Sequence, residues 1–259
     1  MARQATFGAG NAECSRATSS DVAELRELYR REMHCQIVHD SYHARGYLDS
    51  YLLRVNDEVA GYGCVGGHGE MPRVTVKEFF ILPSHRQDAL PLFRDLVAAS
   101  EATRIEVQTN DRLLTRMFYE CVEQFTREKI LFNDARTTNL EIPGATFRMT
   151  TQADSARMFH HSVEPIGEWL IEAEGQIVAT GGVMLHYNPP FGDIYMEVAE
   201  PFRRRGFGGY LVQELKRACY EMGRVPAARC NLANEASRAT LQKAGLMPCA
   251  LLLSGDITG

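Results

Sequence analysis

The fold is decided by the stretch Val198-Ala199-Glu200-Pro201-Phe202-Arg203-Arg204-Arg205-Gly206-Phe207-Gly208-Gly209-Tyr210. A strand pattern ends near Val198, and an amphipathic helix pattern begins near Gly206. The first turn of a helix presents unpaired backbone N–H groups and the positive end of the helix dipole, which together bind phosphate oxygens. Glycines let the backbone approach a ligand, and arginines add charge-assisted hydrogen bonds. The stretch therefore predicts an anion site suited to a diphosphate.

The residues around this stretch predict an alternation of strands and helices. A strand is expected at Asp193–Ala199, and the helix at Gly206–Met222 is expected to end before Gly223. A strand at Arg229–Leu232 and a helix at Glu235–Ala244, with Asn234 as its cap, should follow. Upstream, strands are expected at 169–173 and 176–187.

The first half of the chain repeats this order of elements. The segment Ile81–Arg86 corresponds to Val198–Arg203, and Asn110 corresponds to Asn234. We interpret this as an internal duplication; two unrelated α/β pieces that share an element order are the alternative. The predicted organisation is a flexible segment at 1–18, a first module at 19–144 and a second module at 145–259. Elements of the first module are expected at 21–33, 51–55, 59–65, 74–82, 88–100, 104–108, 111–123 and 140–144.

The second half resembles the GNAT superfamily of N-acetyltransferases. The run Arg203-x-x-Gly206-x-Gly208 is similar to the family's pyrophosphate loop, (Gln/Arg)-x-x-Gly-x-(Gly/Ala). Asn234-Glu235-Ala236-Ser237, followed by a helix that ends at Gly245, is similar to the family's second coenzyme-contacting helix. The segment Leu82–Asp88 of the first half has no glycine, so the first module looks like a degenerate GNAT module. The resemblance implies an α/β fold with a mixed sheet in each of two tandem modules.

The resemblance also implies a reaction and a cofactor site. An amine would attack acetyl-CoA directly in a ternary complex, and the second module would be catalytic. The backbone N–H of Val198 would polarise the thioester carbonyl, in a strand that a bulge separates from its neighbour. Asn234 and Ser237 would contact the pantetheine. The diphosphate would be held by Arg203, Arg204, Arg205, Gly206, Phe207, Gly208, Gly209 and Tyr210.

An alkyl ammonium must lose a proton before it attacks, so a base or a water chain is needed. Strand alternation places Asp193, Tyr195 and Glu197 on one face. Glu197 is the candidate base, and Tyr195 is a candidate substrate contact or proton relay. The alternative for Glu197 is a salt-bridged strand residue.

One departure from the family pattern concerns the leaving group. The family often places a tyrosine on the second coenzyme helix to protonate the thiolate, and Leu241 stands there. Two other functions therefore stay open: an acyltransferase that uses a longer acyl-CoA, and a non-catalytic acyl-CoA-binding or sensor protein. The acceptor would be a small-molecule or peptide amine. The first module would close the acceptor pocket, stabilise the pair or form a homodimer.

Composition narrows the class of protein. The net charge of −5 argues against a broad nucleic-acid surface. The seven cysteines include no CxxC pair, so neither a disulfide framework nor a zinc knuckle is indicated, and no metal is expected. No apolar run has the length of a membrane span, and no signal-peptide core is seen near Met1, which together favour a cytoplasmic protein without membrane partners.

Two further patterns are set aside. The run Gly61–Gly66 spells GxGxxG, but a strand pattern rather than a helix follows it, so it predicts a glycine-rich hairpin. His34, His39 and His43 lack the tight spacing of a metal site.

Overall fold

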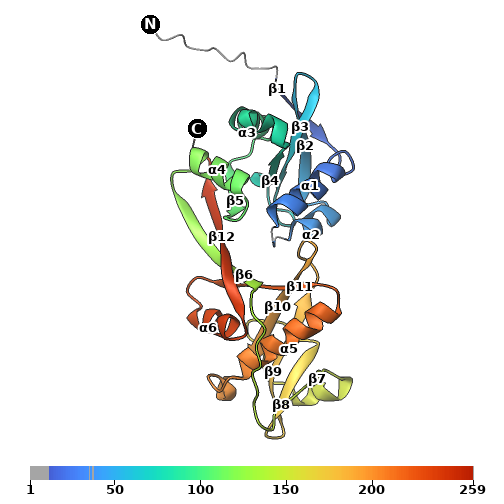
Figure 1. Ribbon diagram of the computed structural model, residues 1–259, viewed down its shortest axis with the longest axis vertical. Helices are drawn as coiled ribbons and strands as arrows, with labels where there is room; N and C mark the ends of the chain where they lie inside the picture. Colours follow the sequence, from blue (N-terminus) through green and yellow to red (C-terminus); the bar gives the residue numbers. More distant parts are fainter. Residues whose placement is uncertain (1–11, 35, 37, 259) are drawn as a thin grey trace. The chain divides into compact units, whose positions relative to one another are not determined.

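A computed structural model describes residues 12–34, 36 and 38–258 of the chain (Figure 1). These residues divide into two compact units. One contains the described residues of Met1–Cys35, Ser41–Arg127 and Leu252–Gly259, and the other contains those of Gln36–Asp40 and Glu128–Leu251. Each unit is described by itself.

The first unit is built on a mixed sheet with the strand order β1-β2-β3-β4-β5. Its neighbours pair antiparallel, apart from β4 and β5, which are parallel. The part of β12 at Leu252–Asp256 pairs antiparallel with β5, so the last strand of this sheet comes from the end of the chain. The elements are β1 (Ala12–Ala17), α1 (Ala23–Met33), α2 (His39–Ala44, whose first two residues belong to the other unit), β2 (Leu48–Val55), β3 (Glu58–Gly66), β4 (Thr75–Ile81), the 3₁₀ helix η1 (Pro83–Asp88), α3 (Ala89–Ser100), β5 (Arg104–Gln108) and α4 (Arg112–Cys121).

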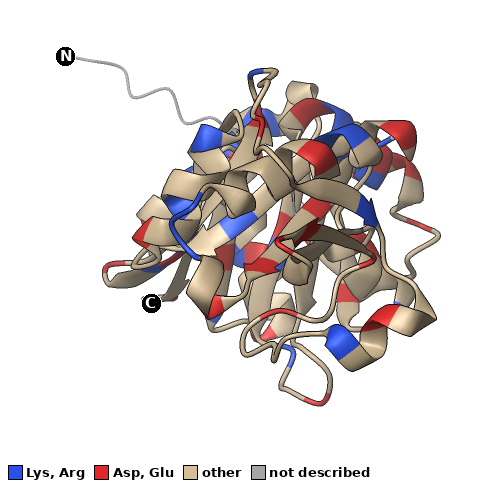
Figure 2. Ribbon diagram, turned by 90° about the horizontal axis from the view of Figure 1, so that it is seen from below, with Lys and Arg blue, Asp and Glu red and all other residues tan. Residues whose placement is uncertain are grey.

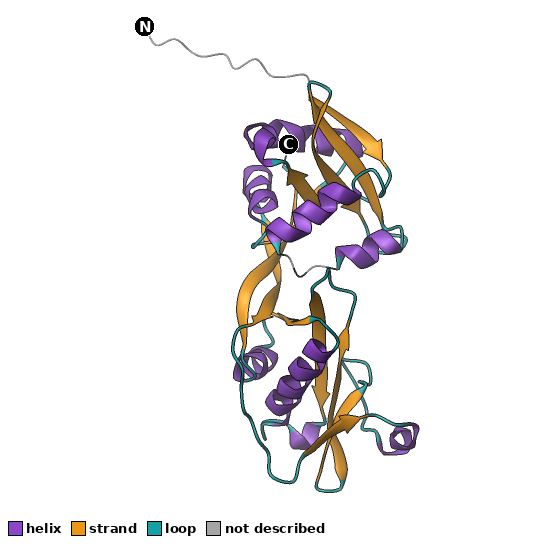
Figure 3. Ribbon diagram, turned by 45° about the vertical axis from the view of Figure 1, so that its right-hand side comes forward, coloured by secondary structure: helices purple, strands orange, loops and turns teal. Residues whose placement is uncertain are grey.

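The second unit has the strand order β6-β11-β10-β9-β8-β7, again with one parallel pair, β10 and β11. Helix α5 packs along β9, β10 and β11, and α6 packs against α5 and β11 (Figure 3). The elements are β6 (Phe125–Asp134), β7 (Thr146–Met149), η2 (Gln152–Arg157), β8 (Trp169–Ala173), β9 (Gln176–Met184), β10 (Phe191–Val198), η3 (Glu200–Phe202), α5 (Phe207–Glu221), β11 (Val225–Asn231), α6 (Glu235–Lys243) and β12 (Leu246–Asp256).

The prediction of an α/β fold with mixed sheets is confirmed, and several boundaries differ. Residues 12–17 of the segment predicted to be flexible form β1, which pairs with β2 in register from Ala12 with Val55 to Ala17 with Ser50. The strand expected at 140–144 is absent from the described chain, and β6 lies further upstream. Its first half carries Thr126, Arg127, Glu128 and Lys129, whose polar run hides the strand pattern.

The division between the units also differs from the predicted boundary after residue 144. It falls inside β6, between Arg127 and Glu128, and a second division falls inside β12, between Leu251 and Leu252. Each of these strands therefore contributes residues to both units. The division of a strand between two units depends on pairing between segments that are distant in the sequence. Local sequence patterns do not predict this pairing.

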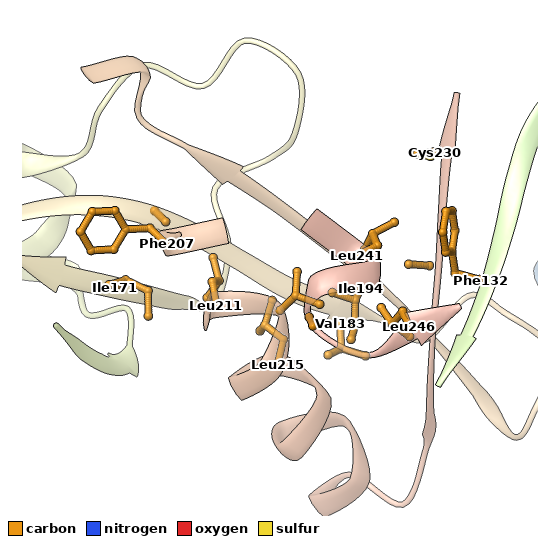
Figure 4. Close-up of a cluster of buried hydrophobic side chains, with 14 of the residues drawn as sticks. Phe132, Ile171, Val183, Ile194, Phe207, Leu211, Leu215, Cys230, Leu241 and Leu246 are labelled. Atoms are coloured by element: carbon orange, nitrogen blue, oxygen red, sulfur yellow. The ribbon is translucent and has the colours of Figure 1, made fainter. Parts of the chain in front are cut away.

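The core of the second unit is an apolar cluster between α5, α6 and the sheet (Figure 4). Helix α5 buries one face, and the apolar residues of that face recur in the sequence at helical spacing. The buried members from α5 are Phe207, Leu211, Val212, Leu215 and Cys219, and those from the sheet and α6 include Ile171, Val183, Ile194, Cys230 and Leu241. This packing fixes the start of α5 against the end of β10.

Basic and acidic residues are interspersed along the described elements (Figure 2). None of the described helices has the length and apolar composition that crossing a membrane requires.

Truncating the α5 stripe should destabilise the second unit. Leu215 is fully buried, so we expect Leu215→Ala to cost about 2–5 kcal/mol of unfolding free energy. Leu185 is 49% exposed, so Leu185→Ala should cost less than about 0.5 kcal/mol. Urea denaturation followed by circular dichroism measures both; equal costs for the two variants would contradict the assigned core.

Candidate functional site

The second unit contains a pair of neighbouring strands that diverge. Strand β10 pairs with β9 from Asp193 to Val198, but with β11 only from Phe191 to Asp193. Strand β11 continues and pairs with β6 up to Asn231. Beyond Asp193, the edge of β10 that faces away from β9 therefore has no strand partner among the described residues.

The backbone of Val198 faces this open edge. The N–H of Ala199 bonds the carbonyl oxygen of Val178 at 2.9 Å, on the β9 side. Because successive backbone groups of a strand point to opposite sides, the N–H of Val198 points away from β9. The Val198 carbonyl accepts a hydrogen bond from Arg203 Nε at 3.2 Å. A free donor at this position fits the role predicted for Val198.

The predicted bulge is not seen at this point. The register between β10 and β9 runs from Asp193 with Met184 to Val198 with Ala179 without a shift. The opening arises because β10 and β11 part after three paired residues, and β10 itself stays regular against β9.

The turn between β10 and α5 has an unusual backbone. Arg204 has φ 59° and Gly206 has φ 94°, so two left-handed residues lie within three positions. A non-glycine residue with positive φ is uncommon and often marks a functional turn. Alternating turns of this kind direct successive N–H groups to one side and create an anion-binding concavity.

Helix α5 begins with free donors at this turn. Its first helical bond runs from the Tyr210 N–H to the Gly206 carbonyl at 3.1 Å. The N–H groups of Phe207, Gly208 and Gly209 have no acceptor among the residues the structure describes. The side chain of Phe207 is buried in the core, so this residue offers its backbone rather than its ring. The N–H groups and the helix dipole make this terminus a site for a phosphate.

Gly208 allows the start of α5 to pack closely. A Cβ atom at this position would lie 3.0 Å from Thr240 Cγ2 of α6 and 3.3 Å from Met196 Cε of β10. A larger residue would push the helix terminus away from both elements. The glycine therefore holds the free N–H groups next to the open edge of β10.

The three arginines of the turn differ in their surroundings. Arg203 bonds the Val198 carbonyl. Arg205 forms an ion pair with Glu174, and its guanidinium lies 5.1 Å from the Phe202 ring centroid and 5.4 Å from that of Phe207. The predicted contact of Arg205 with the phosphates stays a prediction.

Sequence reasoning missed a cation at this turn. Lys243 on α6 places its Nζ atom 3.8 Å from the position of a Cβ on Gly206, and its Cδ atom 3.4 Å from that of a Cβ on Gly209. The side chain is exposed, so its ammonium is available to a ligand. Only the packing of α6 on α5 brings Lys243 here. Its position in the last turn of a helix indicated no more than a favourable dipole contact.

Asn234 and Ser237 lie at the start of α6. Asn234 Oδ1 accepts the Ser237 N–H at 3.0 Å, which makes Asn234 the cap of the helix as predicted. The predicted contact of the two residues with pantetheine stays a prediction.

Glu197 lies on the face of β10 opposite α5, and the structure gives it a different role from the predicted one. Oε1 accepts the N–H and the hydroxyl of Ser162, at 3.1 and 3.0 Å. Oε2 accepts the N–H groups of Val163 and Glu164, at 3.1 and 2.9 Å. Burial opposes ionisation of this carboxylate, but the hydrogen bonds outweigh it and lower the pKa of Glu197 to about 2. Such a carboxylate is a poor proton acceptor, so it acts as a clamp on the loop.

Tyr195 shares this face with Asp193, whose carboxylate contacts His186 and Arg229. Burial raises the pKa of Tyr195, and the nearby carboxylates of Glu168 and Glu164 raise it further. The hydroxyl therefore stays protonated at neutral pH and can donate a hydrogen bond. The face is polar, as the alternation predicts.

The turn after β4 in the first unit shares one contact with this turn and differs in its backbone. Arg86 Nε bonds the Ile81 carbonyl at 3.2 Å, as Arg203 bonds that of Val198. The element η1 leads directly into α3, with no left-handed residue between them. Pro91 in the first turn of α3 has no N–H group, and the carboxylate residue Asp88 occupies the N-cap position without a side-chain cap hydrogen bond. That the first module is a degenerate copy stays a prediction.

The correspondence at the next helix is shifted by one residue. Asp111, rather than Asn110, caps α4, and its side chain accepts the Leu114 N–H at 3.0 Å. The same bond joins Asn234 and Ser237 in the second unit.

The first unit also contains a buried polar cluster. One ligand atom each from His43, Cys64 and Glu78 lies within 4.8 Å of the others. Arg26 donates to both oxygens of Glu78 at 2.9 Å, and the Tyr62 hydroxyl donates to Oε2 at 2.8 Å. The charge of the buried Glu78 is thus balanced by Arg26, which accounts for the cluster as an ion-pair network.

Comparisons with known proteins agree with this geometry. Residues 133–246 match the model of a family described as the acetyltransferase (GNAT) family. A search of curated protein sequences finds no match to the chain.

Solved structures share the fold over nearly the whole chain. An acetyltransferase of the GNAT family from Colwellia psychrerythraea is 13% identical with a TM-score of 0.70, and the alignment covers 95% of this chain and 100% of that chain. A GCN5-related N-acetyltransferase from Sphaerobacter thermophilus is 16% identical, with a TM-score of 0.57 and coverage of 96% of each chain. A tandem GNAT protein from the clavulanic acid biosynthesis pathway is 10% identical, with a TM-score of 0.57 and coverage of 96% and 99%. At these identities the likeness concerns the fold.

The clamp formed by Glu197 predicts a pH-dependent contribution to stability. Because its folded pKa is depressed, the contribution is present above the unfolded value near 4.3 and is lost as pH falls through about 2. We expect Glu197→Gln to cost about 1–3 kcal/mol at pH 7, from weakened hydrogen bonds to a charged acceptor. Urea denaturation of both proteins at pH 7 and pH 3 measures the cost, which should shrink at the lower pH. A pH-independent cost would contradict the clamp.

Proposed function

We propose, from the premise that residues 133–246 belong to the GNAT acetyltransferase family, that this chain transfers an acetyl group from acetyl-CoA to a primary amine. The family implies acyl transfer from an acyl-CoA. The acetyl group, the amine acceptor and direct attack in a ternary complex are the proposed details. The observation that carries the proposal is the open edge of β10 beside the free N–H groups of α5.

The two sets of donors suit the two ends of the coenzyme. The N–H groups of Phe207, Gly208 and Gly209, together with Lys243, would bind the diphosphate. The pantetheine arm would lie along the open edge of β10 and bond its backbone as an added strand does. Arg203 and Arg204 of the turn, Tyr210 of α5, and Asn234 and Ser237 at the start of α6 would contact the coenzyme along this path.

The Val198 N–H would then meet the thioester carbonyl. A donor fixed before the reaction stabilises the charge that develops on the oxygen as the amine attacks. Most of the remaining rate enhancement would come from holding the two reactants in position. The acceptor would approach over the polar face that carries Tyr195, whose hydroxyl can contact it.

The leaving thiolate has no acid at the position where the family often has one. Leu241 is buried in the apolar core, with 4% of its surface exposed. Since a thiol has a reference pKa near 8.5, its thiolate is a tolerable leaving group and water can protonate it. The same observation favours the second candidate function, a protein that binds acyl-CoA without turnover.

The assay that tests the proposal measures acetyl-CoA consumption over a panel of primary amines, with coenzyme binding measured by calorimetry. We expect turnover with at least one amine. Binding of acetyl-CoA without turnover for any amine would favour the binding protein, and absence of binding would contradict the assigned site.

Gly206→Asp should weaken acetyl-CoA binding at least 100-fold, because the aspartate strains a left-handed residue and brings a negative charge to the phosphate site. Gly223→Asp is the matched control: Gly223 also has a positive φ, of 72°, and lies at the other end of α5 with open space around it. Calorimetry should show near-normal affinity for this control. Equal losses in the two variants would point to strain alone.

Lys243→Met should weaken acetyl-CoA binding about tenfold through the loss of a charge-assisted contact of about 1.4 kcal/mol. Its affinity should also depend less on salt, because one cation near the phosphates is gone. Arg205→Met should change affinity less than threefold, since Arg205 pairs with Glu174. The opposite ranking of the two variants would show that Arg205 reaches the diphosphate.

A further inference from the structure

A second carboxylate lies on the acceptor face, in the loop that Glu197 clamps. Glu164 donates its backbone N–H to Glu197 Oε2 at 2.9 Å, and its side chain is partly buried. This hydrogen bond fixes the Glu164 backbone to β10. The acceptor of the bonds that hold the loop is the Glu197 carboxylate, and the Glu164 carboxylate takes no part in them. Sequence reasoning did not single it out, because the loop has no periodic pattern.

The loop is held at both ends. Ser162, Val163 and Glu164 bond the carboxylate of Glu197. Further along, the Gly167 N–H bonds Thr180 Oγ1 of β9 at 3.4 Å, and the Thr150 hydroxyl bonds the Gly167 carbonyl at 2.9 Å. A loop with such anchors can hold a side chain in a defined position, which a reacting group needs.

The charged groups that act electrostatically on Glu164 come from both diverging strands. Asp193 and Glu197 lie on β10, and Arg229 lies on β11, with Lys129 on β6 beyond it. Tyr195 of β10 also lies within electrostatic reach. Both strands that part after Asp193 therefore carry charged groups close enough to act on the Glu164 carboxylate. Burial raises its pKa, the carboxylates of Asp193 and Glu197 raise it further, and Arg229 and Lys129 act in the opposite direction.

We propose that Glu164 is the catalytic base for the acceptor amine and that Glu197 is the residue that positions it, an inference that rests on the proposed acetyl transfer. Glu164 takes one proton from the bound ammonium and passes it to solvent. The freed nitrogen attacks the thioester carbon, so a C–N bond forms and the C–S bond breaks. The second proton of the nitrogen ends on the departing sulfur, which gives the amide and free coenzyme A.

The environment of Glu164 suits a base better than that of Glu197. A general base works best when its pKa approaches the working pH. Four donors stabilise the ionised form of Glu197. Like charges and burial destabilise the ionised form of Glu164, so it holds a proton more strongly. Two neighbouring carboxylates with opposite shifts can divide the roles of anchor and base.

The test compares Glu164→Gln, Glu197→Gln and wild type with an amine that wild type acetylates, over pH 5–9. Glu164→Gln keeps the backbone bond to Glu197, so the fold and acetyl-CoA affinity should be unchanged. Its kcat should fall about 100-fold or more, and the rise of kcat with pH on the acidic side should disappear. The rise toward pH 9 that comes from deprotonation of the amine should persist, because the alkyl ammonium has a pKa near 10.4.

Glu197→Gln separates positioning from proton transfer. Its kcat should fall because the loop is held less firmly, but the acidic rise should remain. Because the charge of Glu197 raises the pKa of Glu164, this rise should move to lower pH in the variant. A purely structural role would lower kcat without moving the profile. Glu221→Gln, an exposed carboxylate at the end of α5, is the control and should match wild type.

The outcomes distinguish the two proposals. If wild type acetylates an amine and Glu164→Gln retains both its kcat within threefold and the acidic rise, Glu164 is not the base and the proposed function stands. If acetyl-CoA binds and no amine is acetylated by wild type, the acetyltransferase proposal falls and this inference falls with it.

Discussion

The site depends on backbone N–H groups that the fold leaves without partners. A buried backbone donor without an acceptor is costly, so nearly all such groups in proteins are paired. Here β10 parts from β11 after Asp193, and α5 begins with three unbonded N–H groups. Gly208 lets the helix terminus approach β10 closely enough for one extended ligand to reach both sets of donors. The side chains around them hold this arrangement in place.

The first unit shows that the scaffold alone does not make such a site. Its strands β4 and β5 also pair over a short register, from Thr75 to Val76 on β4. The turn that follows β4 lacks left-handed residues, and the first turn of α3 contains a proline. Elsewhere in this unit, the Tyr29 hydroxyl of α1 donates a hydrogen bond to Asp111, the N-cap of α4, at 3.1 Å.

The sequence predicts the features that depend on neighbouring residues. It does not predict those that depend on contacts between distant segments. The glycine and arginine turn and the stripe of α5 depend on residues within a few positions, so pattern and turn chemistry find them. Residues 129–133 of β6 pair with β11 in the second unit, and residues 252–256 of β12 pair with β5 in the first, so both pairings join segments that are distant in the sequence. Lys243 comes near Gly206 only when α6 packs on α5. No pattern along the chain encodes either relationship.

The assignment of the base shows why a face is easier to predict than a role. Alternation along β10 places Glu197 on the acceptor face. Whether its carboxylate can take up a proton depends on the donors that hydrogen-bond to its two oxygens. The bonds that fix the loop also stabilise the ionised form of Glu197, so the residue gains anchoring strength as it loses basicity. Glu164 belongs to the same loop and has the opposite balance, because burial and like charge favour its protonated form. Solvation and hydrogen bonding, more than position in a strand, therefore decide which carboxylate can exchange a proton.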